Sequence, residues 1–158
     1  MNIEALSLDE LNAFIVRAKA NSYVGSASKS LSYRPASHDI QFHEGSFSYI
    51  DSYFGGTDFI GQEVVYRHQQ PVWAMNYYGR ILIPNLIDGA QAGQIIKASL
   101  SKLYQEGRFL GGFEVRIEES VYTDTNQGTV ASFSGKEWIT RQEQQVYELL
   151  YHGGMIKD

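Results

Sequence analysis

Two segments of this chain carry nearly the same residues at an offset of 74 positions. Residues 59–81 read FIGQEVVYRHQQPVWAMNYYGRI, and residues 133–155 read FSGKEWITRQEQQVYELLYHGGM. The identical pairs are Phe59/Phe133, Gly61/Gly135, Glu63/Glu137, Arg67/Arg141, Gln70/Gln144, Val72/Val146, Tyr77/Tyr151 and Gly79/Gly153. Such a repeat predicts that one supersecondary unit is used twice, with the two copies burying their apolar faces together. Two unrelated hairpins with convergent turn and strand residues are the alternative.

The chain has the composition of one folded domain. Its 158 residues can bury a hydrophobic core, and 43% hydrophobic with 20% charged residues is unlike a disordered chain. The net charge of -5 opposes binding to a phosphate backbone, so we expect no direct contact with nucleic acid. The absence of cysteine excludes disulfides and thiolate metal sites. We therefore expect a single domain over residues 1–158.

Export and membrane signals are not evident in the sequence. The first residues, MNIEALSLDE, are acidic and are not followed by the apolar stretch of a signal peptide. No apolar run approaches the roughly 18 residues that a membrane span needs. Together with the absence of cysteine, these features predict a cytoplasmic protein that does not contact a membrane.

Two segments have the apolar spacing and the caps of helices. Residues 8–20 follow Ser7, a typical N-cap residue, and carry apolar side chains on one face. Residues 89–106 follow Asp88, with Gln91 at the position that completes a capping box. We expect a helix in each segment.

The remaining sequence is typical of antiparallel strands. The Ser- and Gly-rich stretch 21–37 has no period and is expected to be a loop. Alternating apolar residues then predict one hairpin that turns at Glu44 and Gly45 and a second that turns near Gln69 and Gln70. The second half repeats this plan. The expected fold is therefore α+β, with antiparallel sheet packed against two helices and two pseudo-repeats over about residues 8–81 and 88–156.

The expected register of the second hairpin divides its side chains between two faces. The predicted core face carries Val64, Tyr66, Trp73, Met75 and Tyr77, which correspond to Trp138, Thr140, Tyr147, Leu149 and Tyr151 in the second copy. The opposite face carries Phe59, Glu63, Val65, Arg67, Val72, Ala74, Asn76, Tyr78 and Arg80.

The mixed face is a candidate binding surface. Asn76, Tyr78 and Arg80 of the first copy are replaced by Leu, His and Gly in the second, so only one copy keeps these hydrogen-bonding groups. This asymmetry points to a site in the first copy that also includes Glu63. The alternative is that Glu63 and Arg67 form an ordinary exposed charge pair, which contributes about 0 to 1 kcal/mol.

His38 is a second candidate, because the expected turn places it opposite Asp51. A histidine held by a carboxylate can act as a general base, although a structural hydrogen bond within a sheet is the commoner role of such a pair. The histidines lack the spacing of a metal site, and the chain has no nucleophile elbow or glycine-rich nucleotide loop, so we expect no metal and no cofactor.

The chain resembles a bacterial family of uncharacterised domains. The resemblance rests on FIVRAKANSYVG, RPASHDIQFHEGSFSYIDSYFGG, FIGQEVVYRHQQPVWAMNYYGR and VYELLYHGG, and it covers nearly the whole chain. Members of this family stand alone or follow a helix-turn-helix domain in transcriptional regulators. The resemblance implies no catalytic residues. The residues that it places on motif positions are Arg34, His38, Asp39, Asp51, Glu63, Trp73, Asn76, Tyr77 and Tyr78.

Three functions are compatible with these features. The first is a non-enzymatic module that senses a small molecule or binds a protein partner, with Arg34, His38, Asp51, Glu63, Asn76, Tyr78 and Arg80 as candidate binding residues. The second is a small hydrolase or isomerase that uses His38 with Asp51 or Glu63 as acid and base. The third is a structural module that forms a homodimer through its aromatic surface.

Overall fold

The computed structural model describes residues 5–25, 29 and 31–158; four residues of the predicted loop 21–37 lie outside it. The chain forms two helices and one eight-stranded antiparallel sheet with the strand order β1-β2-β3-β4-β8-β7-β6-β5. The elements are α1 (Leu8–Asn21), β1 (His38–Glu44), β2 (Phe47–Gly55), β3 (Phe59–Arg67), β4 (Gln70–Ile81), α2 (Gly89–Gln105), β5 (Phe113–Ile117), β6 (Ser120–Thr129), β7 (Ser132–Arg141) and β8 (Gln144–Met155). The fold is α+β, as predicted, and β4 pairs with β8 at its centre.

Both helices begin where the predicted caps place them. The Ser7 hydroxyl oxygen accepts the backbone N–H three residues later at 3.4 Å. Asp88 and Gln91 make both hydrogen bonds of a capping box, at 2.8 and 3.0 Å. The helices predicted over 8–20 and 89–106 are confirmed to within one residue at each end.

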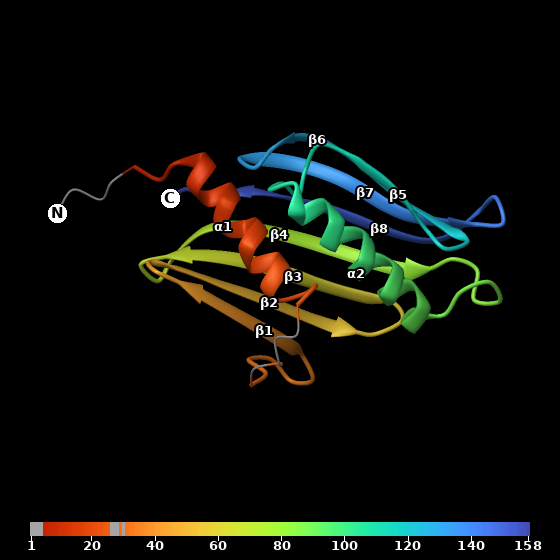
Figure 1. Ribbon diagram of the computed structural model, residues 1–158. Helices are drawn as coiled ribbons and strands as arrows, with labels where there is room; N and C mark the ends of the chain where they lie inside the picture. The colour runs from red at the N-terminus through yellow and green to blue at the C-terminus, as the bar shows by residue number, and fades with distance from the viewer. Residues whose placement is uncertain (1–4, 26–28, 30) are drawn as a thin grey trace.

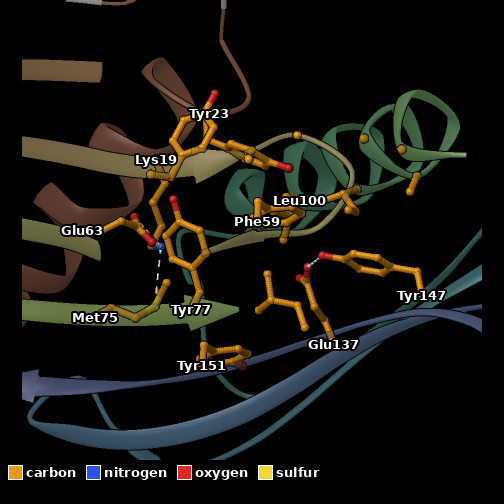
Figure 2. Close-up of a pocket in the computed structure, with 18 of the residues that line it drawn as sticks. Lys19, Tyr23, Phe59, Glu63, Met75, Tyr77, Leu100, Glu137, Tyr147 and Tyr151 are labelled. Atoms are coloured by element: carbon orange, nitrogen blue, oxygen red, sulfur yellow. Dashed lines mark hydrogen bonds and ion pairs between the residues drawn. The ribbon is translucent and has the colours of Figure 1, made fainter. Parts of the chain in front are cut away.

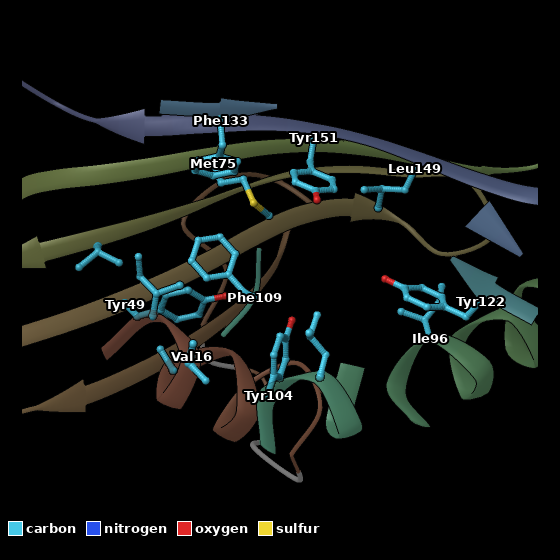
Figure 3. Close-up of a cluster of buried hydrophobic side chains, with 14 of the residues drawn as sticks. Val16, Tyr49, Met75, Ile96, Tyr104, Phe109, Tyr122, Phe133, Leu149 and Tyr151 are labelled. Atoms are coloured by element: carbon cyan, nitrogen blue, oxygen red, sulfur yellow. The ribbon is translucent and has the colours of Figure 1, made fainter. Parts of the chain in front are cut away.

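Both helices lie over the same face of the sheet (Figure 1). Buried side chains from the helices and from the strands form one hydrophobic cluster that is rich in aromatic rings (Figure 3). Trp73 is fully buried, with its ring centroid 5.9 Å from that of Phe109 and 5.8 Å from that of Phe133. Its indole N–H donates to the carbonyl of Val130 at 3.0 Å, so the polar end of the side chain is satisfied.

The register of the β3–β4 hairpin differs from the prediction. The turn residues are His68 and Gln69, both with positive φ, and a β-bulge lies between Val65 and Tyr66. Neither feature has a clear signal in the sequence, since glycine and asparagine are the usual residues of such a turn. Because side chains alternate with a period of two, a shift of one residue moves them to the opposite face.

As a consequence, several side chains lie on the face opposite to the predicted one. Trp73 and Met75 are buried on the helix-covered face as predicted, but Val65 and Glu63 are their partners there. Three groups of residues are misassigned. Val64 and Tyr66 lie on the far face, and so do Trp138 and Thr140 of the second half. The helix-covered face instead carries Phe59, Glu63, Val65 and Arg67.

The β1–β2 hairpin is also shifted. Its turn lies at Gly45 and Ser46, one residue later than predicted, so His38 pairs with Tyr53 and not with Asp51. Gly45 has φ +61°, a conformation that glycine adopts without strain, and it therefore occupies the first position of this turn. The predicted pairing of His38 with Asp51 is wrong.

Corresponding residues of the two halves occupy corresponding places in the sheet. Asp51 pairs with Glu63 across β2 and β3, and Asp124 pairs with Glu137 across β6 and β7. The correspondence extends to Tyr49 and Tyr122, to Gly61 and Gly135, to Tyr77 and Tyr151, and to the turns at 68–69 and 142–143. Two acidic pairs therefore lie on the helix-covered face, one in each half.

Candidate functional site

A cavity of about 320 Å³ lies between the two helices and the sheet. Its walls are mainly aromatic and apolar, and its inner end is polar. The walls include Tyr23, Tyr53, Phe59, Met75, Tyr77, Ile96, Leu100, Phe109, Tyr147, Leu149 and Tyr151, and the polar groups include Lys19, Glu63, Asp124 and Glu137 (Figure 2). A space of this size with few polar groups is typical of small-molecule sites.

Helix α2 leaves room for the cavity because small residues face it near the helix N-terminus. Gly89, Gly93, Ile96, Leu100 and Tyr104 follow one another at spacings of three or four, so they form one stripe along the helix, and all of them line the cavity. A Cβ atom added at Gly93 would meet no atom within 4 Å. The absence of a side chain at this position therefore keeps part of the space open.

Lys19 and Glu63 form a buried ion pair at the polar end. The Lys19 Nζ lies 2.8 Å from both carboxylate oxygens of Glu63, and only 5% of each residue is exposed. Glu63 also accepts a short hydrogen bond from the Tyr49 hydroxyl. The ammonium lies 4.0 Å from the Met75 sulfur and 5.3 Å from the centroid of the Phe109 ring (Figure 2). This environment holds an ammonium ion by charge, by a soft sulfur and by an aromatic face.

In the second half, a second tyrosine hydroxyl takes the place of the lysine. Glu137 accepts a short hydrogen bond from Tyr122 and a second one at 3.0 Å from Tyr147. Asp124 accepts a hydrogen bond at 2.7 Å from Tyr151, which lines the same cavity. These hydroxyls satisfy the carboxylate oxygens without neutralising their charge.

A tyrosine hydroxyl also holds Asp51, the acid paired with Glu63. Asp51 accepts a hydrogen bond at 2.6 Å from the Tyr77 hydroxyl, as Asp124 does from Tyr151. Asp51 lies directly opposite Glu63 in the sheet and is buried beside it.

Burial governs the protonation of these acids. Burial raises the pKa of Glu137 to about 7 and that of Asp124 to about 6. Burial and the negative charge of Glu63 raise the pKa of Asp51 to about 7. Near neutral pH, these carboxyl groups can therefore gain or lose a proton in response to a bound charge.

The structure places His38 and Glu63 at the cavity, but it does not bring them together. Glu63 is at the polar end, whereas His38 is at the rim, with its Nδ1 3.1 Å from the Lys29 Nζ and its ring 5.1 Å from that of Tyr53. Arg34 is exposed outside the cavity, where its guanidinium donates to the Ser52 hydroxyl at 2.8 Å.

Asn76, Tyr78 and Arg80 lie on the opposite face of the sheet from the cavity. Asn76 accepts a hydrogen bond from Gln62 at 2.9 Å, and Arg80 forms a 2.8 Å ion pair with Glu148. Tyr78 is 45% exposed. The candidate residues from the sequence are therefore divided between two faces, since the shifted register turns Glu63 inward and leaves these three outward.

The sequence contains signals for two residues that reasoning from it missed. Lys19 follows Leu11 and Ile15 at helical spacing, so it lies in line with the buried face of α1. Glu137 is the repeat equivalent of Glu63. Asp124 falls outside the repeated segments, and only the three-dimensional pairing of β6 with β7 identifies it.

Metal and membrane sites have no support in the described part of the chain. No group of three or more His, Asp or Glu side chains there is arranged to hold a metal ion. Across the described ranges, neither helix is long and apolar enough to cross a membrane.

Comparison with known proteins gives a family and no closer relative. Neither the curated proteins nor the solved structures contain a significant match to this chain. The family model described as a domain of unknown function (DUF5680) matches residues 51–156, which include β3, β4 and all of the second half. The chain therefore belongs to the DUF5680 family of domains of unknown function.

Proposed function

We propose that this protein is a non-enzymatic module that binds a small molecule in the cavity between its helices and its sheet. The observation that carries the proposal is the cavity itself, a space of about 320 Å³ lined by aromatic rings with charged groups at its inner end. Apolar walls supply affinity and a few fixed polar groups supply orientation, which suits a ligand with an apolar body and one polar end. The resemblance to domains that accompany helix-turn-helix domains supports a sensory role.

We further propose that the fold arose from two copies of one unit, each a helix followed by four antiparallel strands. The paired acids, the tyrosines that cap them and the left-handed turns at 68–69 and 142–143 support this view. The cavity then lies where the two copies meet, because it is lined by Glu63 of one copy and Glu137 of the other.

Gly93 offers a direct test of the cavity. A Cβ atom at this position would meet no atom within 4 Å, so we expect a leucine side chain to extend into the open space. It would also remove the helix cost of glycine, which is about 1 kcal/mol. We expect Gly93→Leu to fold at least as stably as the wild type but to lose ligand binding. Gly93→Ala has the same helix benefit and leaves most of the space, so it is the matched control.

The measurement is a thermal-shift screen of the three proteins against a metabolite library of cationic, neutral and anionic compounds. A compound at 100 times its dissociation constant stabilises the folded state by about 2.7 kcal/mol. Compounds that stabilise the wild type and Gly93→Ala but not Gly93→Leu support the proposal. Shifts that persist in Gly93→Leu, or a screen without any shift, would overturn it.

Acid–base catalysis is a second candidate function. The observation that favours it is a carboxyl group, Glu137, that lines the cavity and whose pKa burial raises to about 7. Glu137 would then be the proton acceptor, since the shifted register separates His38 from Asp51. Conversion of a bound compound by the wild type, and its loss in Glu137→Gln with binding retained, would distinguish catalysis from binding.

A further inference from the structure

The ion pair of Lys19 and Glu63 shows how this fold holds an ammonium ion. Lys19 leaves α1 and places its Nζ on a carboxylate of the sheet, beside the Met75 sulfur and the face of Phe109. Each of these groups reaches the ammonium from a different element, so the position is defined from several sides (Figure 2). The second half contains the same carboxylate in the same place.

The position that corresponds to Lys19 in the second half is Leu100. Lys19 lies twelve residues after the N-cap Ser7, and Leu100 lies twelve residues after the N-cap Asp88. Both residues line the cavity, as does Glu137, the equivalent of Glu63. The second half therefore has the acceptor of the ion pair, while its helix carries an apolar side chain where the first helix carries the ammonium.

We propose that the cavity binds an organic ammonium ion whose nitrogen contacts Glu137 as the Lys19 ammonium contacts Glu63. This inference rests on the proposed function, because it names the ligand class of the same cavity. Each oxygen of Glu137 already accepts one tyrosine hydroxyl and has capacity for one further donor. The ligand would supply the positive charge that the second helix lacks at position 100.

The other walls of the cavity suit the remainder of such a ligand. Asp124 lies opposite Glu137 in the sheet, so two carboxylates face the position of the nitrogen. Tyr151 and Phe59 present rings at the cavity, and aromatic faces attract cations. Leu100 and Leu149 provide apolar contact. An alkyl or aryl amine has this combination of a cationic end and an apolar body.

Protons compete with the ligand for Glu137. The titratable and charged groups that act on this carboxyl are Lys19 of α1, Tyr23, Tyr104 of α2, Tyr122 and Asp124 of β6, and Tyr147 and Tyr151 of β8. Burial raises the pKa of Glu137 to about 7, so the group holds a proton below that pH and an ammonium ligand must displace it. Binding of a cation should therefore release a proton and weaken as the pH falls.

Two substitutions test the role of Glu137 by opposite routes. Leu100→Lys adds to α2 the ammonium that α1 carries, so it should neutralise Glu137 internally and abolish binding of amines. Leu100→Met has a similar unbranched chain without the charge, so the difference in amine affinity between the two variants reports the effect of the charge. Glu137→Gln keeps the shape and removes the charge, and it should weaken amine binding about tenfold or more while leaving neutral compounds unaffected.

The probes are 4-phenylbutylamine, 4-phenylbutan-1-ol and 4-phenylbutyrate, which share one apolar body and differ in charge. Titration calorimetry at pH 8 in phosphate buffer avoids competing amines and keeps the amine probe protonated. We expect the amine to bind about tenfold or more tightly than the alcohol, and the carboxylate to bind least. At pH 5 the advantage of the amine should shrink.

The outcomes separate this inference from the proposed function. An alcohol or carboxylate that binds as tightly as the amine would overturn the ammonium proposal and leave a small-molecule site in place. Equal amine affinity in Leu100→Lys and Leu100→Met would also overturn it. If none of the three probes binds, the ammonium proposal fails, whereas the proposed function depends on the broader screen and on Gly93→Leu.

Discussion

Lys19 and Glu63 are buried together, and each neutralises the charge of the other. The ammonium lies 2.8 Å from both carboxylate oxygens, and both residues are 5% exposed. We expect Lys19→Met, which keeps the length of the side chain, to destabilise the fold by about 3 to 5 kcal/mol because it leaves an uncompensated buried charge. Urea unfolding at pH 7 measures the loss.

The double variant Lys19→Met/Glu63→Gln is the control for this prediction. Removing both charges leaves no buried ion, so most of the lost stability should return. A loss below about 1 kcal/mol in Lys19→Met alone would mean that water reaches Glu63 and that the pair is not structural.

Trp73 anchors the centre of the core. It is fully buried against Phe109 and Phe133, so Trp73→Ala should cost about 3 to 5 kcal/mol in the free energy of unfolding. Tyr78→Ala removes a neighbouring aromatic ring from the exposed face and should change stability by less than about 1 kcal/mol. Equal losses in the two variants would contradict the assignment of the two faces of β4.

The sequence predicts the burial of some of these residues correctly and that of others wrongly. The burial of Trp73 and Met75 follows from the alternation of β4 beyond its bulge at Val72, so it is predicted correctly. Glu63 is predicted on the wrong face because the hydrophobic pattern of the hairpin does not reveal the extra residue, Val72, that β4 carries after the turn. Charged residues are also usually exposed, and Glu63 can be buried because Lys19 on another element pairs with it.

Glycines in β3 and β7 bring the tyrosines of the adjacent strands close to the sheet. A Cβ atom at Gly135 would overlap the ring of Tyr151, and one at Gly61 would overlap that of Tyr77. We expect Gly135→Ala to cost about 1 to 3 kcal/mol, because the ring must move and its hydrogen bond to Asp124 is then disturbed. Thermal unfolding and the near-ultraviolet circular dichroism of the tyrosines would report both effects.

Gly56→Ala is the control for this strand effect. Gly56 lies in the loop between β2 and β3, where an added Cβ would meet no atom within 4 Å. Its substitution should leave the fold intact, and it tests whether any added methyl group near the cavity is harmful. A neutral Gly135→Ala would show that the tyrosine does not need this close approach.

Helices and strands were predictable to different degrees for physical reasons. Each helix has a local signal, since Ser7 and Asp88 cap it and its apolar residues repeat with the helical period. Strand positions also follow from local alternation, but register depends on turns such as His68–Gln69, whose residues are uncommon in left-handed conformations. The cavity has no local signal, because it depends on how α2 lies over the sheet.

The arrangement of the whole chain concentrates negative charge in its interior. Asp51, Asp124 and Glu137 are buried on the helix-covered face, and burial raises the pKa of each, to about 7, 6 and 7 respectively. The folded state therefore holds protons more tightly than the unfolded chain, whose carboxyl groups titrate near 4. The contribution of these protons to stability is fully present below about pH 4 and is lost as the pH rises through about 7.

Glu148, on the opposite face, does not offset this loss of stability with rising pH. Hydrogen bonds from Lys136 and Arg80 lower the pKa of Glu148, so its contribution is lost only as the pH falls below the ordinary carboxyl range. Between pH 5 and pH 8 the buried acids therefore act in one direction, and they lower the stability of the ligand-free protein as the pH rises.

Glu137→Gln isolates this effect within the whole molecule. The amide does not titrate, so the variant should resemble the wild type near pH 5 and exceed it at pH 8 by about 1 to 3 kcal/mol, since each pKa unit corresponds to about 1.4 kcal/mol. Urea unfolding at pH 5, 6, 7 and 8 measures the difference, with Glu143→Gln in the exposed β7–β8 turn as the control. Parallel pH profiles for Glu137→Gln and the wild type would show that this acid keeps its ordinary affinity for protons. If Glu137→Gln exceeds the wild type in stability by more at pH 8 than at pH 5, the ligand-free protein retains a charge that a bound cation could neutralise.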